Sequence, residues 1–342
     1  MKELILVTGG TGYIGSHTAV ELINEGYEVV IVDNLANSTV DSLDGIEKIT
    51  GVRPAFEQFD LCDKPNVEAF FRKYSRLKAI IHFAAYKAVG ESVDQPLKYY
   101  RNNLVSLMNL LECMEQFKVP LMVFSSSCTV YGQPKELPVT ENAPILPAES
   151  PYGNTKQICE EILRDSVCSM PALQVISLRY FNPIGAHPSA LIGELPQGIP
   201  NNLVPFVTQT AAGLRGELKI FGDDYPTPDG SAVRDYINVT DLAKAHVTAI
   251  RRLLDQKNET GLEFFNLGTG HGTSVLEMVK TFEKVTGVPV NYMVVGRRAG
   301  DIVAVWADTT KANQVLGWKA GTSLEDTLLS AWNWEKKLRG IQ

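Results

Sequence analysis

The chain has 342 residues, a formal net charge of −7 and 44% hydrophobic residues, values typical of a folded globular protein rather than of a disordered or fibrous one. At about 150 residues per domain, its length predicts roughly two domains. The acidic balance argues against a nucleic-acid-binding surface, and no apolar run is long enough to cross a membrane. The five cysteines are scattered and form no C-x-x-C pair, which argues against a metal site or a disulfide framework. A strand-like stretch begins at residue 4, so we expect no signal peptide and a cytoplasmic protein.

The first half of the sequence alternates between short apolar runs and longer segments with helical periodicity. Such runs are typical of strands that are buried on both faces of a sheet. A regular alternation of strand and helix predicts an α/β fold with a Rossmann-type, doubly wound parallel sheet. The expected strands lie at 4–7, 29–32, 79–83, 121–124 and 175–178, and the expected helices near 13–25, 64–75, 96–117 and 151–166.

The character of the sequence changes near residue 180. Five prolines fall between residues 183 and 205, where there is little periodicity. We predict a first domain over 1–180 and a smaller, mixed α/β substrate domain over 181–342, with a segment near 234–255 that returns to the first domain. Further helices are expected near 201–214, 274–286 and 323–338.

A glycine-rich sequence, TGGTGYIG at 8–15, joins the first strand to the first helix. Gly9, Gly12 and Gly15 allow a tight turn, the close approach of a pyrophosphate, and close packing of the helix on the sheet. The phosphates of a dinucleotide would lie at the positive end of the helix. A glycine triplet also occurs in ordinary tight turns, so the neighbouring strands and helices decide its meaning.

The second strand ends in an acidic residue at the expected distance from this loop. Asp33 lies 18 residues after Gly15, where a carboxylate can accept hydrogen bonds from an adenosine ribose. Asp33 would repel a 2′-phosphate, and 34–36 contains no arginine to bind one, which favours NAD over NADP. Asp60 and Leu61, between the expected strands at 29–32 and 79–83, are expected to border the adenine, although Asp60 could equally be an ordinary aspartate at a strand end.

A serine, a tyrosine and a lysine come later in the chain with a spacing suited to proton transfer. Ser127 ends the fourth expected strand, and Ser150-Pro151 is a typical helix start. Tyr152 and Lys156 are then four residues apart on one helix face. For Tyr152 to act as a base near pH 7, its pKa must fall by about three units, for which Lys156 and a positive nicotinamide ring are the expected causes. Beside the glycine loop, this set predicts hydride transfer coupled to proton transfer at a carbinol carbon.

Together these features resemble the extended short-chain dehydrogenase/reductase family, over essentially the whole chain. Within that family, they are similar to enzymes that epimerise UDP-hexoses at C4. The most specific matching motifs are FAAYKAVGES at 83–92, RYFNP at 179–183, PNNL at 200–203 and VRDYI at 233–237.

The resemblance implies roles for three sets of residues. The catalytic set is Ser127, Tyr152 and Lys156. The NAD-binding set is Gly9, Gly12, Tyr13, Ile14, Gly15, Asp33, Asn34, Asp60, Leu61, Phe83, Ala84, Ala85, Lys87, Asn102, Ser127, Tyr152, Lys156 and Phe181. The UDP-sugar set is Ser127, Tyr152, Asn182, Asn202, Leu203, Arg234, Tyr236, Arg298, Asp301 and Val305.

The resemblance also implies the reaction. Tyr152 would take the proton of the sugar's 4-hydroxyl while C4 passes hydride to NAD, and the 4-keto sugar would turn over before both are returned, interconverting UDP-galactose and UDP-glucose. Val305 replaces a tyrosine found in some of these epimerases, so we expect room for the N-acetyl group of UDP-GalNAc or UDP-GlcNAc. Helices 96–117 and 151–166 are expected to form a homodimer interface, as in related enzymes.

Three other functions fit the same scaffold less well. A nucleotide-sugar dehydratase needs an acid/base pair just after the serine, and Cys128 and Thr129 stand there instead. A UDP-glucuronate decarboxylase or epimerase needs a further cation, which we could not identify in the sequence. A non-catalytic NAD-binding regulator would be favoured by loss of the serine, tyrosine or lysine, and all three are present.

Overall fold

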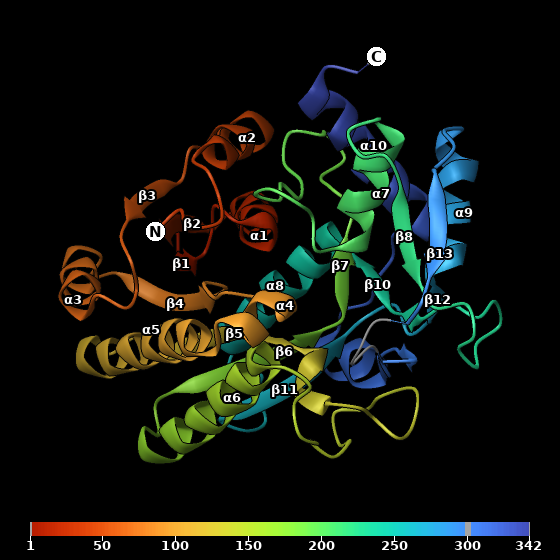
Figure 1. Cartoon of the computed structure of the whole chain (residues 1–342). Helices are drawn as coiled ribbons and strands as arrows, with labels where there is room; N and C mark the ends of the chain where they lie inside the picture. The colour runs from red at the N-terminus through yellow and green to blue at the C-terminus, as the bar shows by residue number, and fades with distance from the viewer. Residues whose placement is uncertain (1, 298–301, 342) are drawn as a thin grey trace.

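The computed structural model describes residues 2–297 and 302–341. Its centre is a sheet of seven strands: β1 (Leu4–Thr8), β2 (Glu28–Asp33), β3 (Ala55–Gln58), β4 (Leu77–His82), β5 (Leu121–Ser127), β6 (Gln174–Tyr180) and β11 (Leu262–Leu267). They are parallel throughout and lie in the order β11-β6-β5-β4-β1-β2-β3 (Figure 1). The predicted Rossmann-type sheet is therefore confirmed.

Helices cover both faces of this sheet. One face is covered by α1 (Tyr13–Asn24), α2 (Asp41–Thr50) and α8 (Val239–Leu254), and the other by α3 (Lys64–Lys73), α5 (Pro96–Phe117) and α6 (Pro151–Ser169). Because side chains alternate along a strand, Ile5 and Val7 of β1 enter the first core, whereas Leu4 and Leu6 enter the second. All four side chains are buried, which explains why the strand reads as a continuous apolar run.

The rest of the chain forms smaller sheets and a third core at the carboxyl ends of the strands. Val207, Met278, Phe282 and Trp332 are central to this core. The paired strands are β7 (Asn182–Ile184) with β10 (Tyr236–Asn238), β8 (Leu218–Phe221) with β13 (Tyr292–Val295), and β9 (Val233–Arg234) with both β12 (Thr273–Ser274) and β14 (Ala304–Val305). The remaining helices are α4 (Val89–Asp94), η1 (Cys128–Tyr131), α7 (Leu203–Ala211), α9 (Val275–Thr286), η2 (Ala312–Leu316) and α10 (Leu324–Arg339).

Two late segments pack with the N-terminal part. Helix α8 lies against α1 and brings Leu242, Ala245 and Ile250 into the first core. Strand β11 pairs with β6 along its whole length, from Leu262 opposite Val175 onward. The division of the chain at residue 180 stays a prediction.

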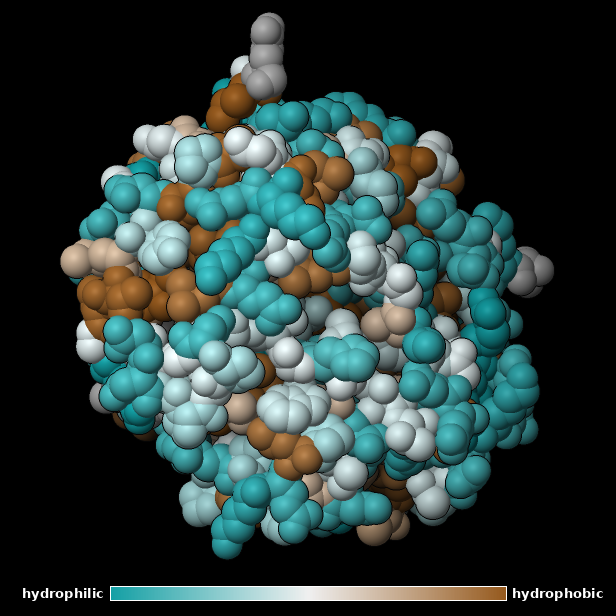
Figure 2. Space-filling model, turned by 90° about the vertical axis from the view of Figure 1, so that its right-hand side faces the viewer, coloured by the Kyte–Doolittle hydropathy of each residue, from teal (hydrophilic) through white to brown (hydrophobic). Residues whose placement is uncertain are grey.

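The face of the molecule that carries α9 and β13 shows hydrophobic residues as separate patches among hydrophilic ones (Figure 2). On the two-stranded sheet of β8 and β13, the side chains of Phe221, Tyr292, Met293 and Val294 are 36–42% exposed. None of the helices in the described part of the chain, not even α5 with its 22 residues, has the length and hydropathy of a membrane span.

Candidate active site

The glycine-rich loop connects β1 to α1 in a conformation that only small residues permit. Gly9 has φ +68°, and a Cβ there would lie 2.8 Å from the backbone nitrogen of Ala84. A Cβ at Gly15 would overlap the carbonyl oxygen of Gly9, so the helix packs directly on the loop. At Gly12, a Cβ would meet only that same oxygen, at 3.2 Å, and otherwise open space. The loop thus leaves a free surface at the N-terminus of α1, where a phosphate can approach the backbone.

Asp33 at the end of β2 ties this loop to the segment after the strand. Its carboxylate accepts hydrogen bonds from the backbone nitrogen of Thr11 at 3.3 Å, the backbone nitrogen of Leu35 at 2.9 Å and Oγ of Ser38 at 3.2 Å. These bonds hold the acidic group beside the glycine loop, as its expected contact with an adenosine ribose requires.

Asp60, predicted with Leu61 to border the adenine, follows β3 and contacts Asn34 of the predicted NAD set, which follows β2. Nδ2 of Asn34 donates to Oδ2 of Asp60 at 3.1 Å. Leu61 is buried, and its carbonyl oxygen accepts a hydrogen bond from Asn109 of α5. Asn102 lies on the same helix, and its carbonyl oxygen accepts from the thiol of Cys62.

The segment after β4 lies against the glycine loop. The backbone nitrogen of Phe83 donates to the carbonyl oxygen of Thr8 at 3.1 Å, and that of Ala84 donates to Oγ1 of the same threonine at 3.3 Å. Phe83, Ala84 and Ala85 therefore adjoin the turn in which Gly9 lies.

A buried asparagine that the sequence did not single out fixes the continuation of this segment. Asn103 of α5 accepts from the backbone nitrogen of Tyr86 at 2.9 Å, and its Nδ2 donates both to the carbonyl oxygen of Tyr86 and to Oγ1 of Thr155, each at 3.0 Å. It thus joins the segment that carries Lys87 to α6, which carries the proposed base.

Ser127, Tyr152 and Lys156 come together at the carboxyl end of β5. Ser127 is the last residue of β5, and α6 begins beside it because Ser150 caps the helix by accepting from the backbone nitrogen of Gly153 at 3.2 Å. Lys156 is buried, with its Nζ 6.0 Å from the centre of the Tyr152 ring. The Ser127 hydroxyl lies near the Tyr152 phenol and acts to lower its pKa.

Burial dominates the electrostatics of this group. It lowers the pKa of Lys156 from 10.5 to about 8, because the ammonium loses water. It also raises the pKa of the Tyr152 phenol, which outweighs the effect of Ser127. The Lys156 ammonium donates to the carbonyl oxygen of Ser125 at 2.6 Å.

On the substrate side, the predicted residues come from strands that a buried aspartate holds together. Phe181 is buried directly after β6, and Asn182 begins β7, where its backbone nitrogen donates to the carbonyl oxygen of Asp235. Arg234 and Tyr236 flank Asp235 in β9 and β10. The Asp235 carboxylate accepts from backbone nitrogens of the 269–270 turn and from that of residue 307. This role had no signal in the sequence beyond membership of the VRDYI motif.

Asn202 and Leu203 open helix α7, which begins two residues later than predicted. Asn202 occupies the cap position, but its side chain makes no capping bond and donates instead to Glu194. Leu203 packs against the third core. Arg298 and Asp301 lie outside the described residues.

Val305, the expected gate, lies within a small apolar cluster beside the predicted catalytic residues. It is 5% exposed and stands opposite Arg234 in the pairing of β14 with β9. Its cluster joins η1, which comes directly after Ser127, to the residue after β6. The buried members are Val130, Tyr131, Val139, Phe181, Val305 and Ala307.

Thr129 in η1 is a further candidate that the sequence did not identify as a ligand contact. Its Oγ1 is buried and has no hydrogen-bond partner among the described residues. Its backbone nitrogen donates to Oγ of Ser127, so Thr129 adjoins the predicted catalytic residues. A buried hydroxyl without a partner is costly, which marks the position as suited to a polar ligand.

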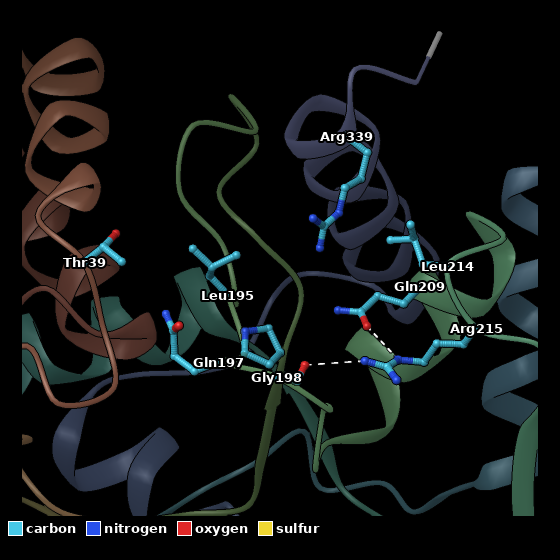
Figure 3. Close-up of a pocket in the computed structure, with 9 residues that line it drawn as sticks. Thr39, Leu195, Gln197, Gly198, Gln209, Leu214, Arg215 and Arg339 are labelled. Carbon is cyan, nitrogen blue, oxygen red and sulfur yellow. Dashed lines mark hydrogen bonds between the residues drawn. The ribbon is translucent and has the colours of Figure 1, made fainter.

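A cavity of about 510 Å³ has no predicted site residue in its wall. Thr39 lies on one side of it, Arg215 and Arg339 lie on the other, and the 195–198 loop runs between them (Figure 3). Arg215 donates to Gln209 at 2.7 Å and to the carbonyl oxygen of Gly198 at 3.4 Å. Within the described ranges, no group of three or more His, Cys, Asp or Glu residues is arranged to hold a metal ion.

The chain is similar over nearly its whole length to known enzymes that act on nucleotide sugars. The GDP-mannose 4,6 dehydratase family matches residues 6–330. The UDP-glucose 4-epimerase of Bacillus subtilis (strain 168) is 53% identical over 331 residues, which cover 97% of this chain and 96% of that one. A crystal structure of the Stenotrophomonas maltophila UDP-glucose 4-epimerase, with bound NAD and formylated UDP-arabinopyranose, has a TM-score of 0.95 at 47% identity, covering 99% and 100% of the two chains. The UDP-Glc/GlcNAc 4-epimerase of Campylobacter jejuni has a TM-score of 0.84 at 37% identity, covering 98% and 99%.

Proposed function

The chain belongs to the UDP-glucose 4-epimerase family of extended short-chain dehydrogenases/reductases, and we propose from this membership that it interconverts UDP-galactose and UDP-glucose with NAD. One observation above all supports this reaction. Ser127, Tyr152 and Lys156 meet at the carboxyl end of β5, in the same sheet whose first strand runs into the glycine loop. Open α/β sheets bind their ligands at this edge.

The residues around the loop fit a dinucleotide. Gly12 leaves space at the N-terminus of α1, and the first backbone N–H groups of a helix have no partner within the helix, so they are available to phosphate oxygens. Asp33 is held where it can accept from a ribose. When bound, NAD would take hydride from C4 of the sugar and return it, and its positive ring would lower the pKa of a nearby phenol.

Tyr152 is the group that we expect to hold the proton of the 4-hydroxyl. Ser127, which lies near this phenol, would orient the same hydroxyl and donate to the ketone that forms. The hydrogen bond from Lys156 to the Ser125 carbonyl oxygen would hold the lysine ammonium next to the strand that carries Ser127. Arg234 carries a charge that can bind a pyrophosphate in a chain whose net charge is −7.

The reaction can be tested without adding cofactor. The purified protein is incubated with UDP-galactose, and the anomeric signals are followed by NMR. Appearance of UDP-glucose would establish a tightly held cofactor and the 4-epimerase reaction. No conversion, even after NAD is added, would reject this function.

We also propose that N-acetylated UDP-hexoses are accepted. Val305 is smaller than tyrosine, and it lies in the cluster that includes Phe181, next to Asn182 of the predicted substrate set. The Campylobacter jejuni relative is named as an epimerase of both UDP-Glc and UDP-GlcNAc, so this breadth occurs on a closely similar fold. Turnover of UDP-galactose without any turnover of UDP-GalNAc would contradict the proposal.

Dehydration, the chemistry in the name of the matched family, is disfavoured at this site. A dehydratase needs an acid/base pair after the serine. Burial raises the pKa of Cys128 to about 12, so the thiol would stay protonated, and Thr129 offers only a hydroxyl. The expected products of dehydration, 4-keto-6-deoxy sugars, would be visible in the same NMR experiment.

We further propose a homodimer formed through α5 and α6. These two helices pack side by side on one face of the sheet, and Leu97 and Met108 of α5 are 79% and 41% exposed. Covering such side chains is a common source of association energy. Sedimentation at micromolar concentration should give the dimer mass, and a monomer would contradict this assembly.

A cytoplasmic location is our remaining proposal. All five cysteines are free thiols, and Cys113 and Cys159 are buried. Free thiols persist in a reducing compartment. Recovery of this protein from cells in a disulfide-linked form would argue against that location.

A further inference from the structure

Glu194 lies in the connection between β7 and α7, and its carboxylate contacts one residue from each predicted ligand set. Oε1 accepts a hydrogen bond from Nδ2 of Asn202 at 2.5 Å, on the substrate side. The same atom lies 3.7 Å from Nζ of Lys87, on the cofactor side. Burial, with the nearby charge of Glu194, raises the pKa of Tyr13 in the first turn of α1, and the Tyr13 phenol donates to the carbonyl oxygen of Gly185 at 2.6 Å.

The backbone at Glu194 is anchored to helix α10. Nε1 of Trp334 donates to the carbonyl oxygen of Glu194 at 3.0 Å. One residue earlier, Gly193 forms a bridge with Ala186, and the backbone nitrogen of Ala186 donates to Oγ of Ser330 at 3.0 Å. The carboxylate therefore projects from a point that two α10 side chains fix, and it can hold other groups in place.

The hydrogen bond between Glu194 and Asn202 also closes the loop between them. On its outer side this loop borders the large cavity, where Arg215 donates to the carbonyl oxygen of Gly198 (Figure 3). Asn202 stands at the cap of α7, yet its amide is directed to Glu194 rather than to the helix. The start of α7, with Leu203, is thus placed through the glutamate.

The contacts of Glu194 contribute little to the stability of the fold. The Lys87 side chain is 46% exposed, and ion pairs with such exposure contribute little to folding. The Glu194 side chain is only 13% exposed, and burying a carboxylate is costly unless it is hydrogen-bonded. The consistent effect of the contacts is to fix where Lys87 and Asn202 lie.

We propose that Glu194 is a positioning residue that sets Lys87 in place for the cofactor and Asn202 in place for the UDP-sugar. This inference rests on the proposed function, because it takes the ligands of these two residues from it. Glu194 would act through its neighbours, and no contact of its own with either ligand is required.

Two substitutions separate the two contacts. In E194Q, the remaining amide oxygen can still accept from Asn202, but the charge that faces Lys87 is lost. In E194A, both contacts are lost. The matched control is E3Q, at an exposed glutamate just before β1, at the amino end of that strand.

The measurements are the rate at which bound NAD exchanges with labelled NAD and the Kd of UDP by calorimetry, both on the protein as purified. We expect E194A to raise both by about tenfold, the size typical of a lost charge-assisted hydrogen bond. E194Q should speed NAD exchange while leaving the UDP Kd within about twofold, and E3Q should change neither. Thermal unfolding verifies that each variant is folded.

A double-mutant cycle distinguishes positioning from a general loss of structure. In the K87M background, adding E194Q should change NAD exchange by less than about twofold, because the residue through which it acts is gone. Additive effects in this cycle would overturn the role of Glu194 but not the proposed function. The same holds if the NAD exchange rate and the UDP Kd of E194A stay within about twofold of wild type. Wild-type protein that bound neither NAD nor UDP would overturn the proposed function and this role with it.

Discussion

Lys156 of α6 donates a hydrogen bond of 2.6 Å to the carbonyl oxygen of Ser125 in β5, two residues before Ser127. The bond joins the helix that carries the proposed base to the strand that carries the proposed serine. Nζ also lies 4.8 Å from the centre of the Phe124 ring, so the ammonium is enclosed by protein. The position of the proposed catalytic residues and the protonation of this lysine are therefore linked.

Because of this burial, we expect Lys156 to make stability depend on pH. Its pKa falls from 10.5 in an exposed setting to about 8 in the folded protein. Between these values the unfolded chain binds a proton that the folded chain has released, so the free energy of unfolding rises with pH, by up to about 3 kcal/mol. Below pH 8 both states are protonated and this contribution is constant.

Urea unfolding of wild type and K156M at pH 8 and pH 10 checks this prediction. From pH 8 to pH 10, the free energy of unfolding of the wild type should increase relative to that of K156M, since only the wild type has the buried lysine. K284M, at an exposed lysine of α9, serves as the control for a general effect of losing a charge. A difference that stays constant with pH would show that Lys156 is not desolvated as described.

Substituting Tyr152 by phenylalanine tests its role as the proton carrier. Y152F keeps the ring and its packing but removes the hydroxyl, so we expect kcat to fall by about 10²–10⁴ while the Kd of UDP changes little. Initial rates with UDP-galactose and calorimetry with UDP measure the two quantities. An unchanged kcat would exclude Tyr152 as the base.

Two glycines with different surroundings make a matched pair. G15A would place a methyl group against the carbonyl oxygen of Gly9, so we expect it to cost about 1–3 kcal/mol of unfolding free energy and to weaken NAD binding. A Cβ at Gly90 in α4 would meet nothing within 4 Å, so G90A should be neutral or stabilising by up to about 1 kcal/mol. Chemical unfolding ranks the two, and equal effects would contradict the close packing of α1 on the loop.

Filling the space at Val305 tests the proposed substrate breadth. We expect V305Y to reduce kcat/KM for UDP-GalNAc by at least about 100-fold and to affect UDP-galactose much less, because the ring would occupy the space of the N-acetyl group. V305L, a smaller enlargement at the same buried position, controls for repacking of the cluster. Equal losses for both sugars would indicate that the substitution disturbs the site in general.

Five of the seven sheet strands, β1, β2, β4, β5 and β6, were predictable because each contains a continuous apolar run, whereas β3 and β11 were not predicted. β1 and β5 are read directly from their sequences, since a strand buried on both faces has no polar alternation to obscure it. The strands of the smaller sheets are two to four residues long, as in β9 or β14, and their partners lie far apart in the chain. No local pattern can reveal such pairs.

The candidate site was likewise predictable only where its residues lie close together in the sequence. Tyr152, Lys156 and Ser150 were predictable because they share one helix, whose capping and spacing obey local rules, and the cap is confirmed. Glu194 was not, because a single glutamate in a proline-rich loop carries no periodicity, and its partners arrive from distant segments. Asn103 likewise lies in the middle of a long helix, and only its burial reveals its role.

The position of β11 has a consequence for how the chain is made. During synthesis, six of the seven strands leave the ribosome well before residues 262–267 do, so β6 remains an unpaired edge for much of translation. Helix α8, which packs against β5 and β6, is also synthesised after these strands. An exposed apolar edge invites pairing with other chains. The nascent protein should therefore depend on a chaperone, or on rapid elongation, until its last strand is available to close the sheet.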